Sequence, residues 1–125
     1  GVCFSAPSIS QRAAIHALRM RDKVNPGLVE EYRKRVFYTY ERINRIAKMS
    51  VVPPQGSFYL FPNIKRTGMT SAEISKKLLE EAHVLVVPGN AFGKSGEGYV
   101  RIACTVETDK LREAFDRIDN MQIFF

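Results

Sequence analysis

The chain has 125 residues, of which 45% are hydrophobic and 26% charged, and its formal net charge is +6. This composition is typical of one compact globular domain, and it excludes a collagen, a long disordered chain and a disulfide-rich scaffold. No apolar stretch approaches the roughly 20 residues of a membrane helix, and no signal-peptide pattern opens the chain. We therefore expect a moderately basic, cytoplasmic domain with no membrane partner.

The positive charge is concentrated between Arg12 and Lys48, where ten basic and four acidic residues account for the whole excess. A basic helical region can bind phosphate backbones, so one alternative is a non-catalytic module that binds nucleic acid or an acidic protein through Arg33-Lys34-Arg35. The other alternative is a solvated face, or a face that meets acidic groups outside this chain. The charges after Met49 balance, which argues against nucleic acid as a partner.

Cysteine and histidine residues predict no metal site. Cys3 and Cys104 form no C-x-x-C pair, and they are expected to be reduced thiols. The two histidines, His16 and His83, cannot complete a His/Cys cluster with the usual ligand spacing.

Two helices are predicted before Met49. The first begins at Ser8 or Ser10, with apolar residues at helical spacing up to Arg21. The second begins at Asn25-Pro26, because asparagine caps a helix and proline fits its first turn. Its apolar residues recur every three or four positions to about Met49, which gives a length of roughly 35 Å at 1.5 Å per residue. We expect this long helix to connect two bodies.

The segment after Met49 predicts a layer of strands and helices. Strands are predicted at residues 57–61, 84–87 and 99–104, and helices are predicted after Thr70 and after Thr108. Thr70 and Glu73 have the spacing of a capping box, and Thr108 is the predicted cap of the last helix. The fold class is therefore α+β: a small, mostly antiparallel sheet with helices packed on one face, preceded by the two helices.

The glycine-rich segment 89–98 does not match a phosphate-binding loop. Such a loop needs four residues between its first glycine and the Gly-Lys pair, and only three separate Gly89 from Gly93-Lys94. It must also open a helix, whereas this segment leads into the predicted strand 99–104.

Arg101 is the candidate functional residue that the strand pattern singles out. Alternation places Tyr99, Arg101 and Ala103 on one face of the strand and Val100, Ile102 and Cys104 on the other. A guanidinium is costly to bury unless an anion meets it, and its planar fork matches a carboxylate with two hydrogen bonds. The alternative is an edge-strand arginine that reaches water or pairs with a local glutamate.

Three segments, in this order and spacing, resemble the C-terminal part of class I/II aminotransferases, the fold-type I pyridoxal-phosphate-dependent enzymes related to aspartate and aromatic aminotransferases. They are Pro54-x-Gly56-Ser57-Phe58-Tyr59-x-Phe61-Pro62, Val86-Val87-Pro88-Gly89-x-Ala91-Phe92-Gly93 and Gly96-x-Gly98-Tyr99-Val100-Arg101-Ile102-Ala103. The segment Ser8-x-Ser10-Gln11-x-Ala13-Ala14 resembles the helix start that precedes the small domain of these enzymes.

The resemblance implies that Arg101 binds the α-carboxylate of amino-acid and 2-oxo-acid substrates. Phe92 and Ser5 are further candidates for substrate contact, Ser5 because residues 4–7 resemble the segment that enters from the large domain. The resemblance also divides the chain into an inter-domain helical arm, residues 1–50, and an aminotransferase small domain, residues 51–125.

The resemblance also implies what the chain lacks. The N-terminal large domain of such enzymes holds pyridoxal phosphate through a lysine and an aspartate, and no stretch here matches those motifs. We expect a C-terminal fragment that has no catalytic residue, binds no cofactor and is inactive alone, from a parent enzyme that is a homodimer. A pyridoxal-phosphate-dependent lyase or synthase of the same fold is the alternative within the resemblance.

Overall fold

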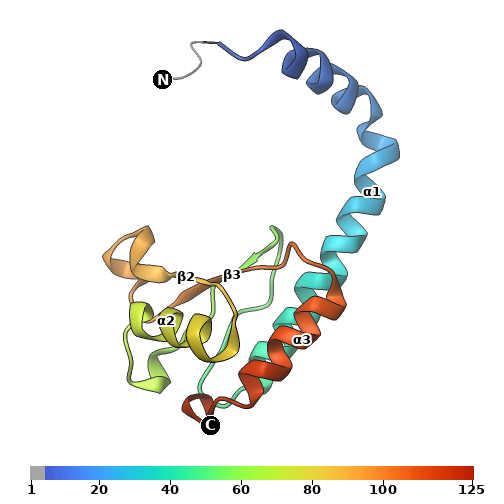
Figure 1. Cartoon of the computed structure of the whole chain (residues 1–125). Coiled ribbons are helices and arrows are strands. Elements are labelled where there is room, and N and C mark those ends of the chain that lie inside the picture. Colours follow the sequence, from blue (N-terminus) through green and yellow to red (C-terminus); the bar gives the residue numbers. More distant parts are fainter. Residues whose placement is uncertain (1–4) are drawn as a thin grey trace. The chain divides into compact units, whose positions relative to one another are not determined.

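The computed structural model describes residues 5–125, which form two compact units. One unit ends at Glu31, and the other is Tyr32–Phe125. The first helix, α1, runs from Ser8 to Arg45 and so contributes residues to both units (Figure 1). The second unit contains the sheet and the remaining helices.

The two helices predicted before Met49 are one helix in the structure. Pro26 lies inside α1 instead of beginning a second helix, and α1 ends at Arg45, four residues before the predicted end. A proline removes one backbone hydrogen bond from a helix interior. The residues on both sides of Pro26 are nevertheless helical.

A three-stranded antiparallel sheet is formed by β1 (Tyr59–Leu60), β2 (Val87–Pro88) and β3 (Val100–Ala103), in the order β1-β3-β2. The strands are shorter than predicted. β1 begins late because Ser57 has a φ of 68°, which is incompatible with an extended strand. β2 begins only at Val87, the last residue of the strand predicted at 84–87.

The helix α2 (Ser71–Ala82) begins as predicted. The Thr70 hydroxyl accepts a hydrogen bond from the Glu73 backbone, and the Glu73 carboxylate accepts one from the Thr70 backbone. The prediction for α3 (Thr108–Asp119) is correct for the helix and wrong for its cap. Thr108 is the first helical residue, so the N-cap residue is Glu107. The Glu107 side chain makes no cap hydrogen bond.

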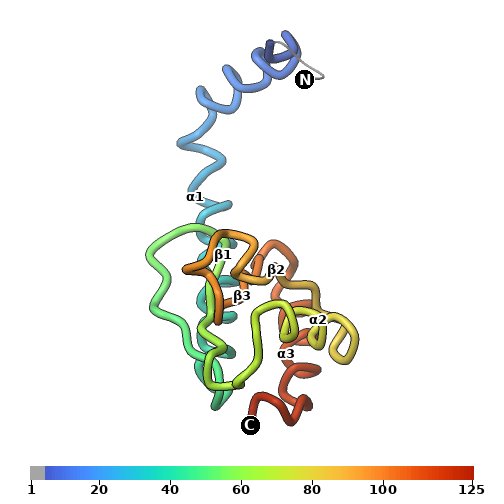
Figure 2. Tube along the Cα trace, turned by 90° about the vertical axis from the view of Figure 1, so that its left-hand side faces the viewer, coloured from blue at the N-terminus to red at the C-terminus, as the bar shows by residue number. Residues whose placement is uncertain are grey.

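One hydrophobic core joins the sheet to all three helices. Figure 1 shows α3 beside the last turns of α1, and Figure 2 shows α2 and α3 side by side. Arg117 Nε links the latter two helices by donating to the Ala82 carbonyl at 2.6 Å. The most deeply buried side chains of this core include Ile43, Ile46, Ile64, Ile74, Leu78, Val100, Phe115, Ile118 and Phe124. The fold class is therefore α+β, as predicted.

No helix within residues 5–125 is long and apolar enough to cross a membrane.

Candidate functional site

The central strand β3 has two different faces, as its alternation predicts. Val100 and Ile102 are buried in the core with Leu60 of β1, and we call this side the helix-covered face. Arg101 is only partly buried and Ala103 is exposed. Tyr59 of β1 pairs with Ala103 in the antiparallel register, so it lies on the same side as Arg101. We call this second side the aromatic face.

The Arg101 guanidinium lies close to two aromatic rings. Its Cζ atom is 4.3 Å from the centroid of the Tyr59 ring and 4.8 Å from the centroid of the Phe92 ring. Both distances are within the range of a cation–π interaction. The structure therefore brings together two predicted candidates, Arg101 and Phe92, and adds Tyr59, which the sequence analysis did not single out. Alternation of side chains along the predicted strand 57–61 is the sequence signal that could have indicated Tyr59.

Arg101 has no acidic partner within the described part of the chain. No carboxylate there lies within 4.0 Å of its guanidinium. Its Nε atom is buried and has no hydrogen-bond acceptor. A buried donor without an acceptor is unfavourable, and natural structures contain few of them. The residues that the structure describes therefore leave this donor of Arg101 without an acceptor.

The segment that carries Phe92 is a tightly folded loop. It forms two short 3-10 turns, Gly89–Phe92 and Lys94–Gly96, and then leads into β3. Gly89 and Gly96 lie backbone against backbone, so a Cβ atom on either glycine would collide with the carbonyl oxygen of the other. The loop has no room for side chains at these two positions, and it does not open an α-helix as a phosphate-binding loop does.

Glu97 fixes the end of this loop to the start of α2. Its carboxylate accepts hydrogen bonds from the Ser71 backbone at 2.7 Å, from the Ser71 hydroxyl at 2.9 Å and from the Gly98 backbone at 3.1 Å. The hydrogen bonds from Ser71 lower the pKa of Glu97 from its usual value of 4.5. The loop and α2 are therefore joined by a carboxylate that is ionised at neutral pH.

Other rings extend the aromatic face. Phe61 stacks on Tyr99 with centroids 5.3 Å apart, and it meets Phe92 edge to face at 6.0 Å. Lys65 Nζ lies 5.0 Å from the centroid of Tyr99. Ser5, the remaining candidate, is exposed and belongs to the unit that ends at Glu31, so its role stays a prediction.

Part of the basic stretch binds groups of this chain. Arg42 Nη2 lies 2.8 Å from Asp116 Oδ1 and 2.8 Å from Asp119 Oδ2. Arg35 Nη1 donates to the Thr105 carbonyl, and Lys48 Nζ donates to the Ile123 carbonyl. Arg35 and Arg42 hold the last turns of α1 against the rest of the Tyr32–Phe125 unit, and Lys48 does the same for the segment that follows α1.

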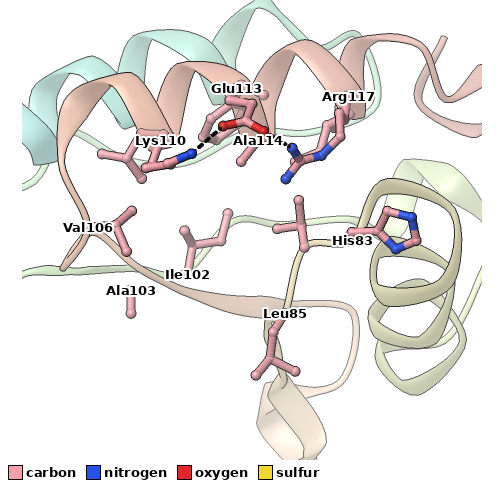
Figure 3. Close-up of a pocket in the computed structure, with 13 residues that line it drawn as sticks. His83, Leu85, Ile102, Ala103, Val106, Lys110, Glu113, Ala114 and Arg117 are labelled. Atoms are coloured by element: carbon pink, nitrogen blue, oxygen red, sulfur yellow. Dashed lines mark hydrogen bonds and ion pairs between the residues drawn. The ribbon is translucent and has the colours of Figure 1, made fainter.

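A pocket of about 370 Å³ lies on another part of the unit, between α3 and the residues before β2 (Figure 3). Its floor is apolar and includes Leu85 and Ile102. Glu113 on its rim pairs with Lys110 at 3.0 Å and with Arg117 at 2.8 Å. Glu113 is thus shared by two cations, so each of these three groups is paired and together they carry a net charge of +1. No cluster of potential metal ligands occurs among residues 5–125.

Comparison with known proteins gives the family context of this geometry. Residues 1–118 match the family "Aminotransferase class I and II". The chain is 45% identical to a probable N-acetyl-LL-diaminopimelate aminotransferase of Bacillus subtilis, over 91% of this chain and 29% of that protein. It is 44% identical to an aspartate aminotransferase of Pyrococcus horikoshii, over 94% of this chain and 31% of that protein.

Solved structures agree with the sequence matches. The crystal structure of an aromatic aminotransferase from Pyrococcus horikoshii has a TM-score of 0.75 and 44% sequence identity, and the match covers 78% of this chain and 26% of that one. The chain thus spans less than a third of the length of these relatives.

Proposed function

Because the chain belongs to the class I and II aminotransferase family, we propose that Arg101 binds the α-carboxylate of the amino-acid and 2-oxo-acid substrates of a cytoplasmic, pyridoxal-phosphate-dependent aminotransferase. In this proposal residues 1–50 are the inter-domain helical arm and residues 51–125 are the small domain. Phe92 and Ser5 are the further candidates for substrate contact.

The observation that carries this proposal is a partly buried guanidinium with no acid beside it in the described residues. An arginine stays protonated at any physiological pH, so its donors are always ready for a carboxylate. Amino-acid substrate and 2-oxo-acid product share that carboxylate. One fixed arginine can therefore orient the molecule in both directions of the reaction, and this orientation lowers the entropic part of the barrier.

Pyridoxal phosphate, when bound in the parent enzyme, supplies the carrier for the amino group and the electron sink for the reaction. Two lysines of this unit already contact groups of the chain itself. Lys48 Nζ is held at the Ile123 carbonyl, and Lys65 Nζ lies over the Tyr99 ring. In our proposal the cofactor is held by an N-terminal large domain, and the parent enzyme is a homodimer.

The chain alone is therefore expected neither to transaminate nor to bind pyridoxal phosphate tightly. Titration of the purified chain with pyridoxal phosphate should leave the absorbance spectrum of the free cofactor unchanged. A stable, borohydride-fixable adduct at one lysine of this chain would contradict that expectation.

The carboxylate role is tested by Arg101→Gln in the full-length enzyme, with several amino acids as substrates. Loss of a charged hydrogen-bonded pair costs about 2–5 kcal/mol, so kcat/KM should fall about 30-fold or more for every amino acid. The absorbance of the bound cofactor should not change. Arg66→Gln, at an exposed arginine, is the matched control. Unchanged kinetics in Arg101→Gln would overturn the proposal.

A further inference from the structure

Resting on the proposed carboxylate role of Arg101, we propose that Tyr59 and Phe92 are positioning residues. They form what we call the aromatic clamp, two rings that hold the Arg101 guanidinium in the orientation that binds a carboxylate. In the clamp, Phe92 acts on the substrate through the arginine, whereas a direct contact of Phe92 with the substrate would act independently of Arg101.

Among the described residues, no polar side chain or carbonyl fixes the Arg101 guanidinium. Its Nε atom lacks an acceptor, and no acid of the described chain pairs with it. An arginine side chain has considerable rotamer freedom, which costs free energy to restrict at the moment of binding. Two rings in contact with the guanidinium restrict that freedom before the substrate arrives. The clamp thus replaces the carboxylate or carbonyl that usually fixes a partly buried arginine.

The two rings also affect the hydration of the Arg101 guanidinium. Guanidinium groups donate hydrogen bonds in their own plane and are weakly hydrated on their faces. The centroids of the Tyr59 and Phe92 rings lie 4.3 Å and 4.8 Å from the Arg101 Cζ atom, so the rings displace water from part of its surroundings and use none of its donors. Lower local polarity strengthens the attraction between the arginine and a carboxylate. The clamp therefore affects the strength of carboxylate binding as well as its geometry.

The fold holds Phe92 at a position that burial of its ring does not by itself explain. The Phe92 side chain remains 51% exposed, so burial gives only part of the free energy that a core phenylalanine would provide. Yet its loop is closed by the backbone contact of Gly89 with Gly96 and is fastened to α2 by Glu97. Placing Phe92 beside Arg101 gives a reason for a rigid loop that carries a half-exposed ring.

The test uses kcat and KM of the full-length holoenzyme for one amino acid and its 2-oxo-acid partner. Phe92→Leu keeps an apolar side chain and removes the π face, so KM should rise about 3- to 20-fold while kcat changes less than threefold. Phe92→Tyr restores a ring and should return KM to within twofold of the wild type. Phe37→Leu is the matched control, because Phe37 is 45% exposed and its nearest ring is Tyr40.

A double-mutant cycle separates the clamp from a general structural effect. In an Arg101→Gln background, Phe92→Leu should have no further effect on KM, because the ring acts through the guanidinium. The clamp is overturned if Phe92→Leu leaves KM unchanged, or if its effect persists undiminished in the Arg101→Gln background. Failure of the proposed function would look different, since Arg101→Gln alone would then leave the kinetics unchanged.

Discussion

The two faces of the small sheet use the same kinds of residue for different purposes. On the helix-covered face, Leu60, Val100 and Ile102 are packed into the core against all three helices. On the aromatic face, Tyr59 remains 38% exposed and Phe92 51% exposed, and the arginine beside them has no acid in the described chain. We expect the first face to contribute most of the stability of the Tyr32–Phe125 unit. We expect the second face to contribute less, because its rings are only half-buried.

Substitutions on the two faces should therefore separate stability from function, and the largest expected effect lies in the core. Phe115→Ala removes a ring that is fully buried beneath the helix-covered face. Lost burial and the remaining cavity should lower the free energy of unfolding by about 3–5 kcal/mol. Urea denaturation of the chain measures this change. A loss of less than about 1 kcal/mol would break the comparison, because the covered face would then not be the stabilising one.

The next largest effect concerns the contact between α1 and α3. Arg42→Met keeps the stem of the side chain and removes its hydrogen bonds to Asp116 and Asp119. Because both aspartates are partly exposed, we expect a loss of about 1–2 kcal/mol in the same urea assay. Arg112→Met, which removes an exposed pair with Asp109, should change the free energy of unfolding by less than about 0.5 kcal/mol. Equal effects of the two variants would show that the α1–α3 contact stabilises the unit no more than an exposed ion pair does.

A smaller effect should appear in the pH dependence of stability. The hydrogen bonds from Ser71 lower the pKa of Glu97 in the folded chain, so the unfolded chain takes up this proton at a higher pH. The contribution of Glu97 is present above its unfolded pKa of about 4.5, and it is lost as the pH falls through the lower folded pKa. In Glu97→Gln, Tm should therefore be lower at pH 7 and should fall less between pH 7 and pH 3.

The matched control for this experiment is Glu107→Gln at the start of α3. Glu107 makes no side-chain cap hydrogen bond, so this variant should keep the wild-type dependence of Tm on pH. The inference about the loop fails if the Tm profile of Glu97→Gln is the same as that of Glu107→Gln.

The smallest expected effect on stability lies on the aromatic face. Arg101→Met loses the attraction to two rings and also removes the buried Nε donor that lacks an acceptor. These effects oppose each other, so the free energy of unfolding should change by less than about 1 kcal/mol. If urea denaturation gave a loss comparable to that of Phe115→Ala, Arg101 would be a structural residue and the difference between the faces would disappear.

Much of the fold could be predicted because it rests on local patterns. The alternation around Arg101 sets the two faces of β3, and the Thr70–Glu73 spacing sets the start of α2. The wrong predictions concern residues whose local preference is overridden in the folded chain. Pro26 favours a helix start but lies inside α1, and Thr108 favours the N-cap but is the first helical residue of α3.

The candidate site could be predicted only in part. Arg101 is conspicuous in an apolar strand, whereas the partner rings come from a different strand and from a loop. Tyr59 reaches the arginine through the register of β1 on β3, and Phe92 reaches it through the fold of the loop that ends at Glu97. Neither the register nor the loop conformation can be calculated from spacing, because both depend on contacts between distant residues.

The contact between Gly89 and Gly96 limits how this protein can be altered. Because two bare backbones touch there, neither position can be enlarged to adjust the depth of the loop. Diversity around the arginine must come from the identities of residues 59 and 92. Variants that probe the surroundings of Arg101 should therefore change residue 59 or 92 and leave both glycines unchanged.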